Sequence, residues 1–199
     1  MAIFSKLIQI FKPNNERVTN TITMNIGNKN NKENGKTGVV WLIDAAYVLK
    51  GHQGKIDYVS IRRELQKWAI PNYGRFDRMI FYNSYDPKNG SDEFIKIMES
   101  NGFEMKMYPL KFMNINCDKC GYKGKRMVQK GVDVAIVTDL LSLAYEGQYK
   151  RIVITAGDGD FLDAVLKVQS MFREVFVAGY RCSMSRDLKE HADGMYYIQ

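Results

Sequence analysis

Residues 151–161 read Arg151-Ile152-Val153-Ile154-Thr155-Ala156-Gly157-Asp158-Gly159-Asp160-Phe161. The apolar run at the start predicts a buried strand, and the glycines predict a tight turn into the helix-patterned residues that follow. Asp158 and Asp160 repel each other across this turn unless a cation or a proton lies between them. A divalent metal held by oxygen ligands accounts for the pair. The alternative is that one aspartate caps the helix while the glycines shape the turn.

Apolar runs of strand length alternate with helical patterns along most of the chain. Strands are expected at 39–43, 78–82, 103–108, 151–155 and 174–178, with a strand-like run at 195–198. Helices are expected at 59–69, 92–101, 132–145, 160–172 and 185–192. This alternation predicts a doubly wound (Rossmann-like) α/β sandwich with a mostly parallel central sheet. Residues 109–130 are expected to form a long loop.

Further aspartates follow the same placement rule. Asp44 comes directly after the first predicted strand, and Asp133 lies in the first turn of a predicted helix. In a sheet of order 3-2-1-4-5 the first and fourth strands are neighbours, so Asp44, Asp158 and Asp160 would meet at one edge. Asp139 lies about two turns after Asp133, and it could be a metal ligand, a supporting residue or an ordinary surface acid.

Composition divides the chain into two parts. Residues 1–12 place apolar side chains on one helical face, and residues 13–37 are rich in Asn, Lys, Gly and Thr. This predicts an N-terminal amphipathic segment and linker over 1–37, followed by one domain over 38–199. No apolar run approaches the roughly 20 residues that span a bilayer, so stable membrane insertion is not expected.

Charge and cysteine content narrow the class of partner. The chain has 29 Lys and Arg against 22 Asp and Glu, a formal net charge of +7. Such a surplus favours an anionic partner, most commonly nucleic acid, although solubility alone can explain it. Three cysteines do not make a disulfide framework, which predicts a cytoplasmic protein.

Several segments together resemble the LabA-like NYN domains of the PIN-like nuclease superfamily. They are Leu42-Ile43-Asp44, Lys130-Gly131-Val132-Asp133-Val134-Ala135, Gly157-Asp158-Gly159-Asp160-Phe161, Ser185-Arg186-Asp187-Leu188 and Ala192-Asp193. The resemblance implies a PIN-like sheet of order 3-2-1-4-5 and a ribonuclease that uses Mg²⁺ or Mn²⁺. Carried over by position, the catalytic and metal-binding residues would be Asp44, Asp133, Asp158 and Asp160, and the substrate would be single-stranded or structured RNA.

The chain departs from this family's pattern after the first aspartate. The family usually has Gly and then Asn there, whereas this chain has Ala45, Ala46 and Tyr47. The supporting residues would then be Tyr47, Asn83 and Asp139. The departure leaves open a catalytically weakened NYN domain that acts as an RNA- or protein-binding module. A phosphatase acting on nucleotides or small phosphoesters is a third alternative.

The predicted loop at 109–130 is strongly basic. Its cationic and aromatic side chains suit a grip on a phosphate backbone with stacking on bases, and a solvated charged loop is the alternative. The candidate RNA-binding residues are Lys111, Lys119, Tyr122, Lys123, Lys125, Arg126 and Lys130.

The same loop contains Cys117-Asp118-Lys119-Cys120, which looks like one half of a zinc ribbon. A closed zinc site needs four ligands, and beyond this pair the chain offers Cys182, His52 and His191 but no second C-x-x-C. A free, reduced pair is therefore favoured over a Zn²⁺ site within one chain. Zinc shared between two chains, in a homodimer, is the remaining alternative.

Overall fold

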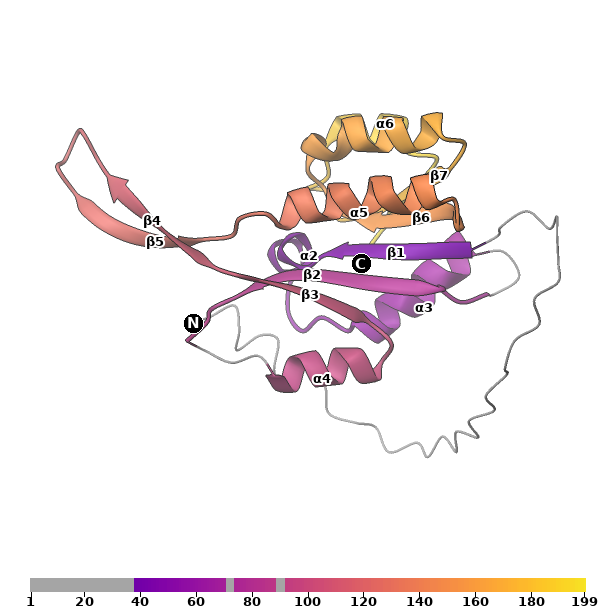
Figure 1. Ribbon diagram of the computed structural model, residues 1–199, viewed down its shortest axis with the longest axis horizontal. Helices are drawn as coiled ribbons and strands as arrows, with labels where there is room; N and C mark the ends of the chain where they lie inside the picture. Colours follow the sequence, from indigo (N-terminus) through magenta and orange to yellow (C-terminus); the bar gives the residue numbers. More distant parts are fainter. Residues whose placement is uncertain (1–37, 71–73, 89–91) are drawn as a thin grey trace.

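The computed structural model describes residues 38–70, 74–88 and 92–199, so the predicted N-terminal segment and linker lie outside the described residues. Its centre is a six-stranded parallel sheet of order β3-β2-β1-β6-β7-β8 (Figure 1). The predicted fold class and the order of the first five sheet strands are confirmed, and β8 extends the sheet by one strand. The strands are β1 (Gly38–Asp44), β2 (Arg78–Tyr85), β3 (Glu104–Pro109), β6 (Tyr149–Thr155), β7 (Glu174–Gly179) and β8 (Gly194–Tyr197).

Helices cover both faces of this sheet, as the buried central strands require. On one face lie α2 (Ala45–Gly51), α3 (Tyr58–Ala69) and α4 (Asp92–Ser100), which pack on Trp41 and Ile43 of β1. On the other lie α5 (Val132–Glu146), α6 (Leu162–Ser170) and α7 (Arg186–His191), which pack on Val40 and Leu42. Alternate residues of β1 thus serve opposite cores, and the even-numbered ones face α5.

Strands β1 and β6 pair at the centre of the sheet. Trp41 is fully buried, and its indole Nε1 donates to Thr155 Oγ1 at 2.8 Å. Ile43 lies opposite Thr155 in the parallel register. This register places the ends of β1 and β6 side by side, so Asp44 lies next to the turn that carries Asp158.

The predicted long loop at 109–130 is wrong, because most of this segment is a β-hairpin. It consists of β4 (Lys111–Asn116) and β5 (Lys123–Val128), which pair antiparallel as a separate two-stranded sheet. The hairpin projects away from the rest of the described chain (Figure 1). Most of its residues are exposed, so its strands lack the apolar pattern from which a buried strand is predicted.

Two helical features also differ from expectation. The short helix α2 was not predicted, although Asp44 forms its N-cap. The helix predicted at 160–172 is divided into the 3₁₀ turn η2 (Gly159–Phe161) and α6. Among the described residues, no helix has the length and apolar content to cross a bilayer.

Candidate active site

Asp44 ends the central strand and begins α2. Its side chain is 8% exposed, and its Oδ1 accepts a hydrogen bond from the backbone N–H of Tyr47 at 3.2 Å. Burial raises the pKa of the Asp44 carboxyl, the Tyr47 N–H partly opposes this, and the negative charge of Asp133 raises it further. Asp44 is therefore a buried acid whose charge is not fully compensated by the protein.

Asp133 comes from a different element, the first turn of α5. Partial burial raises the pKa of its carboxyl, and the charges of Asp158 and Asp160 act in the same direction. The positive charge of Lys50 lowers it. Asp133 thus lies within electrostatic range of the acids that follow β1 and of those that follow β6.

Asp158 and Asp160 occupy the turn between β6 and α6. Asp158 is the N-cap of η2, and its Oδ1 accepts from the backbone N–H of Asp160 at 3.1 Å. The capping role considered from the sequence is confirmed for Asp158. It does not exclude a role as a ligand, because the same carboxylate acts on Asp133.

These four aspartates form one electrostatic group at the carboxyl edge of the sheet, hereafter the acidic mouth. A set of carboxylate oxygens suits Mg²⁺ or Mn²⁺. The pKa values of Asp44 and Asp133 are raised first by burial and then by neighbouring aspartates, and a cation would offset that negative charge. Within the described parts of the chain, no three acidic, cysteine or histidine side chains are drawn together closely enough to hold an ion. The donor chemistry fits a divalent metal, although the side chains do not form a finished coordination shell.

A pocket of about 380 Å³ opens beside the acidic mouth. Lys50 of α2 lines it, and the ammonium group lowers the pKa of both Asp44 and Asp133. The sequence analysis missed Lys50 because it missed α2; the N-cap signal of Asp44 could have revealed that helix. The lining residues are Tyr47, Lys50, Gly51, Gly157, Asp158 and Ser183.

Tyr47 supports this region in two ways. Its backbone N–H binds Asp44, whereas its hydroxyl accepts from Tyr180 N at 2.8 Å and from Ser183 Oγ at 3.2 Å. Its ring fills the space above Gly157, where an added Cβ would lie 2.2 Å from Tyr47 Cε2. The side chain therefore ties α2 to the loop after β7 and does not bond to an aspartate of the acidic mouth in any of these contacts.

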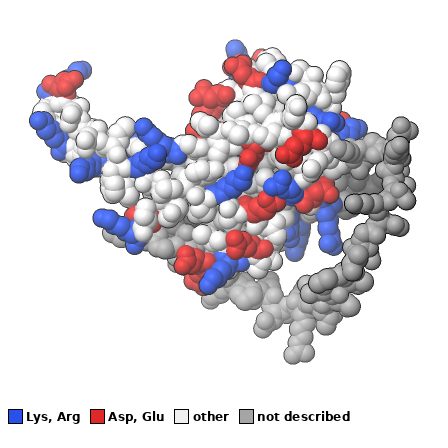
Figure 2. Space-filling view, viewed as in Figure 1, with Lys and Arg blue, Asp and Glu red and all other residues white. Residues whose placement is uncertain are grey.

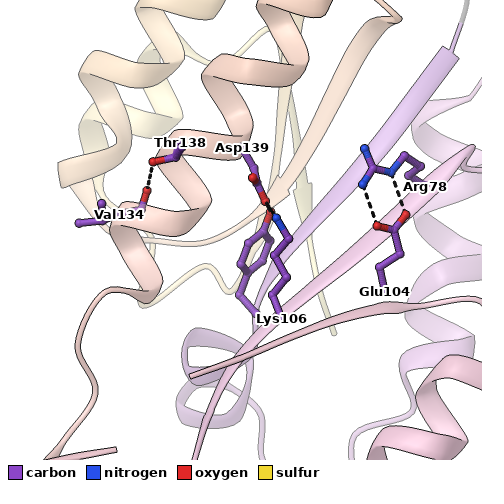
Figure 3. A network of polar contacts seen from close by, with 7 residues as sticks. Arg78, Glu104, Lys106, Val134, Thr138 and Asp139 are labelled. Atoms are coloured by element: carbon purple, nitrogen blue, oxygen red, sulfur yellow. Dashed lines mark hydrogen bonds and ion pairs between the residues drawn. The ribbon is translucent and has the colours of Figure 1, made fainter. Parts of the chain in front are cut away.

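The other two candidate supporting residues are held by partners of their own. Asp139 accepts from the Tyr82 hydroxyl and from Lys106 Nζ, the latter at 2.5 Å (Figure 3). Asn83 lies inside β2, is 5% exposed, and accepts at Oδ1 from the backbone N–H of Ser84. These contacts build the sheet and its junction with α5, and none of them reaches the acidic mouth.

The candidate RNA-binding residues lie on the hairpin and its flanks, hereafter the basic arm (residues 111–130). The arm carries Lys and Arg side chains along its length (Figure 2), and the aromatic rings of Phe112 and Tyr122 are each 61% exposed. It is inserted between β3 and α5, so its base leaves the molecule on the side of the acidic mouth (Figure 1). Asp133 thus lies within electrostatic range of the other three aspartates, and the basic residues lie on a neighbouring projection.

The sheet order, the helices on both faces and the acidic mouth define a PIN-like α/β protein. Residues 36–199 match the NYN domain family, and the chain belongs to that family. A solved structure of a protein of unknown function from Vibrio parahaemolyticus is similar, with a TM-score of 0.61 and 22% identity. The match covers 84% of this chain and 96% of the Vibrio chain, and it supports the fold. No curated protein matches the chain.

Proposed function

We propose that this NYN protein is a metal-dependent ribonuclease that hydrolyses RNA phosphodiester bonds at the acidic mouth. The observation that supports the proposal is the electrostatic coupling of Asp133 to Asp44, Asp158 and Asp160 at the carboxyl edge of the sheet, in a protein of net charge +7. Carboxylates gathered in this way disfavour an anionic substrate unless a cation is present, and a basic surface then supplies the attraction for RNA.

In this proposal the four aspartates hold one or more Mg²⁺ or Mn²⁺ ions. When bound, such ions make a water molecule more acidic and offset the charge of a phosphate. Lys50 faces the same pocket, and its ammonium group would bind a non-bridging phosphate oxygen of the substrate. Tyr47 would act as a positioning residue, because it orders both Asp44 and the loop at Ser183.

The basic arm would bind the RNA strand on either side of the scissile phosphate. Phe112 lies directly opposite Met127 in the hairpin, so the two form an exposed apolar pair next to Arg126. Exposed aromatic and cationic groups of this kind bind a single strand by stacking and by contact with phosphates.

The test is cleavage of single-stranded and structured RNA by the full chain, with Mg²⁺, with Mn²⁺ and with chelator. We expect metal-dependent cleavage that Asp158→Asn reduces by about 100-fold or more, which exceeds the loss typical of outer-shell partners. Asp163→Asn, at an exposed acid of α6, is the matched control and should cleave as the unmodified protein does. Parallel assays with DNA and a simple phosphodiester would distinguish a ribonuclease from a general phosphodiesterase or a phosphatase.

Binding of RNA without turnover is the second candidate function. One observation favours it: the Tyr47 hydroxyl, at the family's usual amide position, bonds to Tyr180 and Ser183. RNA binding that survives chelation, in a preparation that cleaves nothing with either metal, would replace the nuclease proposal with this one.

A further inference from the structure

The tip of the basic arm is a turn that contains two of the three cysteines. Cys117 N–H donates to Tyr122 O at 2.9 Å, and Gly121 N–H donates to Cys117 O at 2.8 Å, which closes the turn around residues 117–122. Gly121 follows Cys120 directly and has a φ of +70°, a conformation that glycine adopts without strain. Cys117 is partly exposed and Cys120 is exposed.

The cysteine pair is preorganised for a metal ion. The backbone N–H of Cys120 donates to the Cys117 sulfur, and the Cys120 thiol and the backbone N–H of Lys119 bind it as well. These contacts place the Cys117 sulfur beside Cys120 within one turn.

One chain does not complete a tetrahedral zinc site here. The sequence has three cysteines and two histidines, and all five lie in the described residues. In the described chain no third acid, cysteine or histidine joins the pair in a group that could hold a metal. Cys182 lies in the loop after β7, on the body of the domain and not on the arm.

Among the described residues, the strands of the arm form a sheet of their own, apart from the central sheet. Those two strands pair with each other, and a two-stranded hairpin alone is marginally stable in water. Phe112, Tyr122, Met113 and Met127 are 61%, 61%, 43% and 41% exposed, which is a large apolar content for a free projection. Among the described residues this apolar surface is uncovered, so it is available to a second copy of the chain.

We propose that two copies of this chain join at the tips of their basic arms through one zinc ion, held by Cys117 and Cys120 of each copy. Four sulfur ligands are the complement of a closed structural zinc site. A zinc ion with four thiolates carries a net charge of −2, which Lys119 and Lys123 of both tips offset. The bridge would leave both acidic mouths open, so it does not depend on the ribonuclease proposal.

The experiment measures zinc content and molar mass for the full chain purified in a reducing buffer with added zinc. We expect one tightly bound zinc per two chains and the molar mass of a dimer, which a strong chelator converts to a monomer. Replacement of zinc by cobalt should give the intense thiolate-to-metal absorption of a four-sulfur site.

Variants locate the site. Cys117→Ser and Cys120→Ser should each lose the bound zinc and the dimer, whereas Cys182→Ser, the matched control, should keep both. The fold of each variant is checked by its circular dichroism, since a tip substitution leaves the packed core intact. Absence of zinc after reconstitution, one zinc in each monomer, or a dimer that persists in Cys120→Ser or in chelator would each overturn the proposal.

Discussion

The acidic mouth and the basic arm lie on the same side of the molecule, but different forces hold their side chains in place. Asp44 extends a strand whose residues from Val40 to Ile43 are fully buried, so packing on both faces fixes where the carboxylate lies. The arm has no core of its own, and cross-strand pairs and the turn at its tip determine its shape. The carboxylates at the edge of the sheet are therefore held in place by packing, whereas the cationic and aromatic side chains of the arm extend into solvent.

The contrast between the packed sheet and the exposed arm predicts a large difference in the free energy of unfolding between substitutions in the two regions. Leu42→Ala removes a fully buried side chain beside α5, and such a substitution costs about 2–5 kcal/mol of unfolding free energy. Met113→Ala, at a residue of the arm that is 43% exposed, should change it by about 0.5 kcal/mol or less. Urea unfolding of both variants provides the comparison, and a similar cost at the two positions would show that the arm packs on the core.

The same contrast explains which features could be predicted from the sequence. Buried strands such as β1 and β6 are continuous apolar runs, so the sheet and the aspartates at its edge were predictable from Val39-Val40-Trp41-Leu42-Ile43 and Ile152-Val153-Ile154. The strands of the arm are solvated on both faces, so polar residues such as Asn114 and Lys125 occupy them and give no strand pattern. Their pairing became visible only in three dimensions.

The positions of the candidate acids at strand ends and at a helix start could be predicted from the sequence, whereas the nearby positive charge of Lys50 could not. Asp133 and Asp158 belong to local patterns, a helix start and a strand end. Lys50 lies near Asp44 in the sequence, but its effect on the distant Asp133 depends on the fold, and no local spacing encodes it. For the same reason the sequence did not show that Tyr47 bonds to Tyr180, which lies 133 residues further along the chain.

The next largest effect concerns metal binding at the acidic mouth. Metal that binds the folded state stabilises it by about 2.7 kcal/mol at a hundredfold excess over its dissociation constant. We expect Asp133→Asn to lose most of the rise in Tm that Mg²⁺ or Mn²⁺ produces, as measured by thermal melts with and without metal. Asp163→Asn is the control on the exposed surface, and an equal metal-induced rise in Asp133→Asn would remove Asp133 from the ligand set.

The metal-free protein gives a pH test of the same residue. Because the folded-state pKa of Asp133 is raised above its usual 3.8, the folded state holds this proton more tightly than the unfolded chain. The raised pKa of Asp133 therefore stabilises the folded state fully at a pH below the unfolded-state pKa. This stabilisation is lost as the pH rises through the folded-state pKa. Asp133→Asn should gain stability relative to the unmodified protein across that rise, and unfolding curves from acidic to neutral pH in chelator would measure the difference. A difference that shrinks with rising pH would contradict the raised pKa.

A smaller effect is expected from the hydroxyl of Tyr47. Tyr47→Phe removes the acceptor of Tyr180 N–H and Ser183 Oγ while keeping the ring against Gly157. The loss of these bonds should cost about 1 kcal/mol of unfolding free energy, and the loop at Ser183 should become more mobile. Tyr145→Phe, at a tyrosine that is 85% exposed, is the control and should leave the free energy of unfolding in urea unchanged. If the nuclease proposal holds, Tyr47→Phe should lower kcat more than RNA affinity, whereas a loss confined to affinity would mean that Tyr47 contacts RNA directly.

The smallest effect belongs to single charges of the arm. Lys125 lies opposite Asn114 in the exposed hairpin. Lys125→Ala should therefore leave the free energy of unfolding unchanged and remove one contact to the RNA backbone. For single-stranded RNA the slope of log affinity against log salt should then fall by about 0.7. Lys96→Ala, at an exposed lysine of α4, is the matched control and should keep the original slope. Binding isotherms over a range of salt concentrations would measure both variants. If the two lysines had equal effects, RNA would be attracted by net charge alone, and the arm would have no special part in binding.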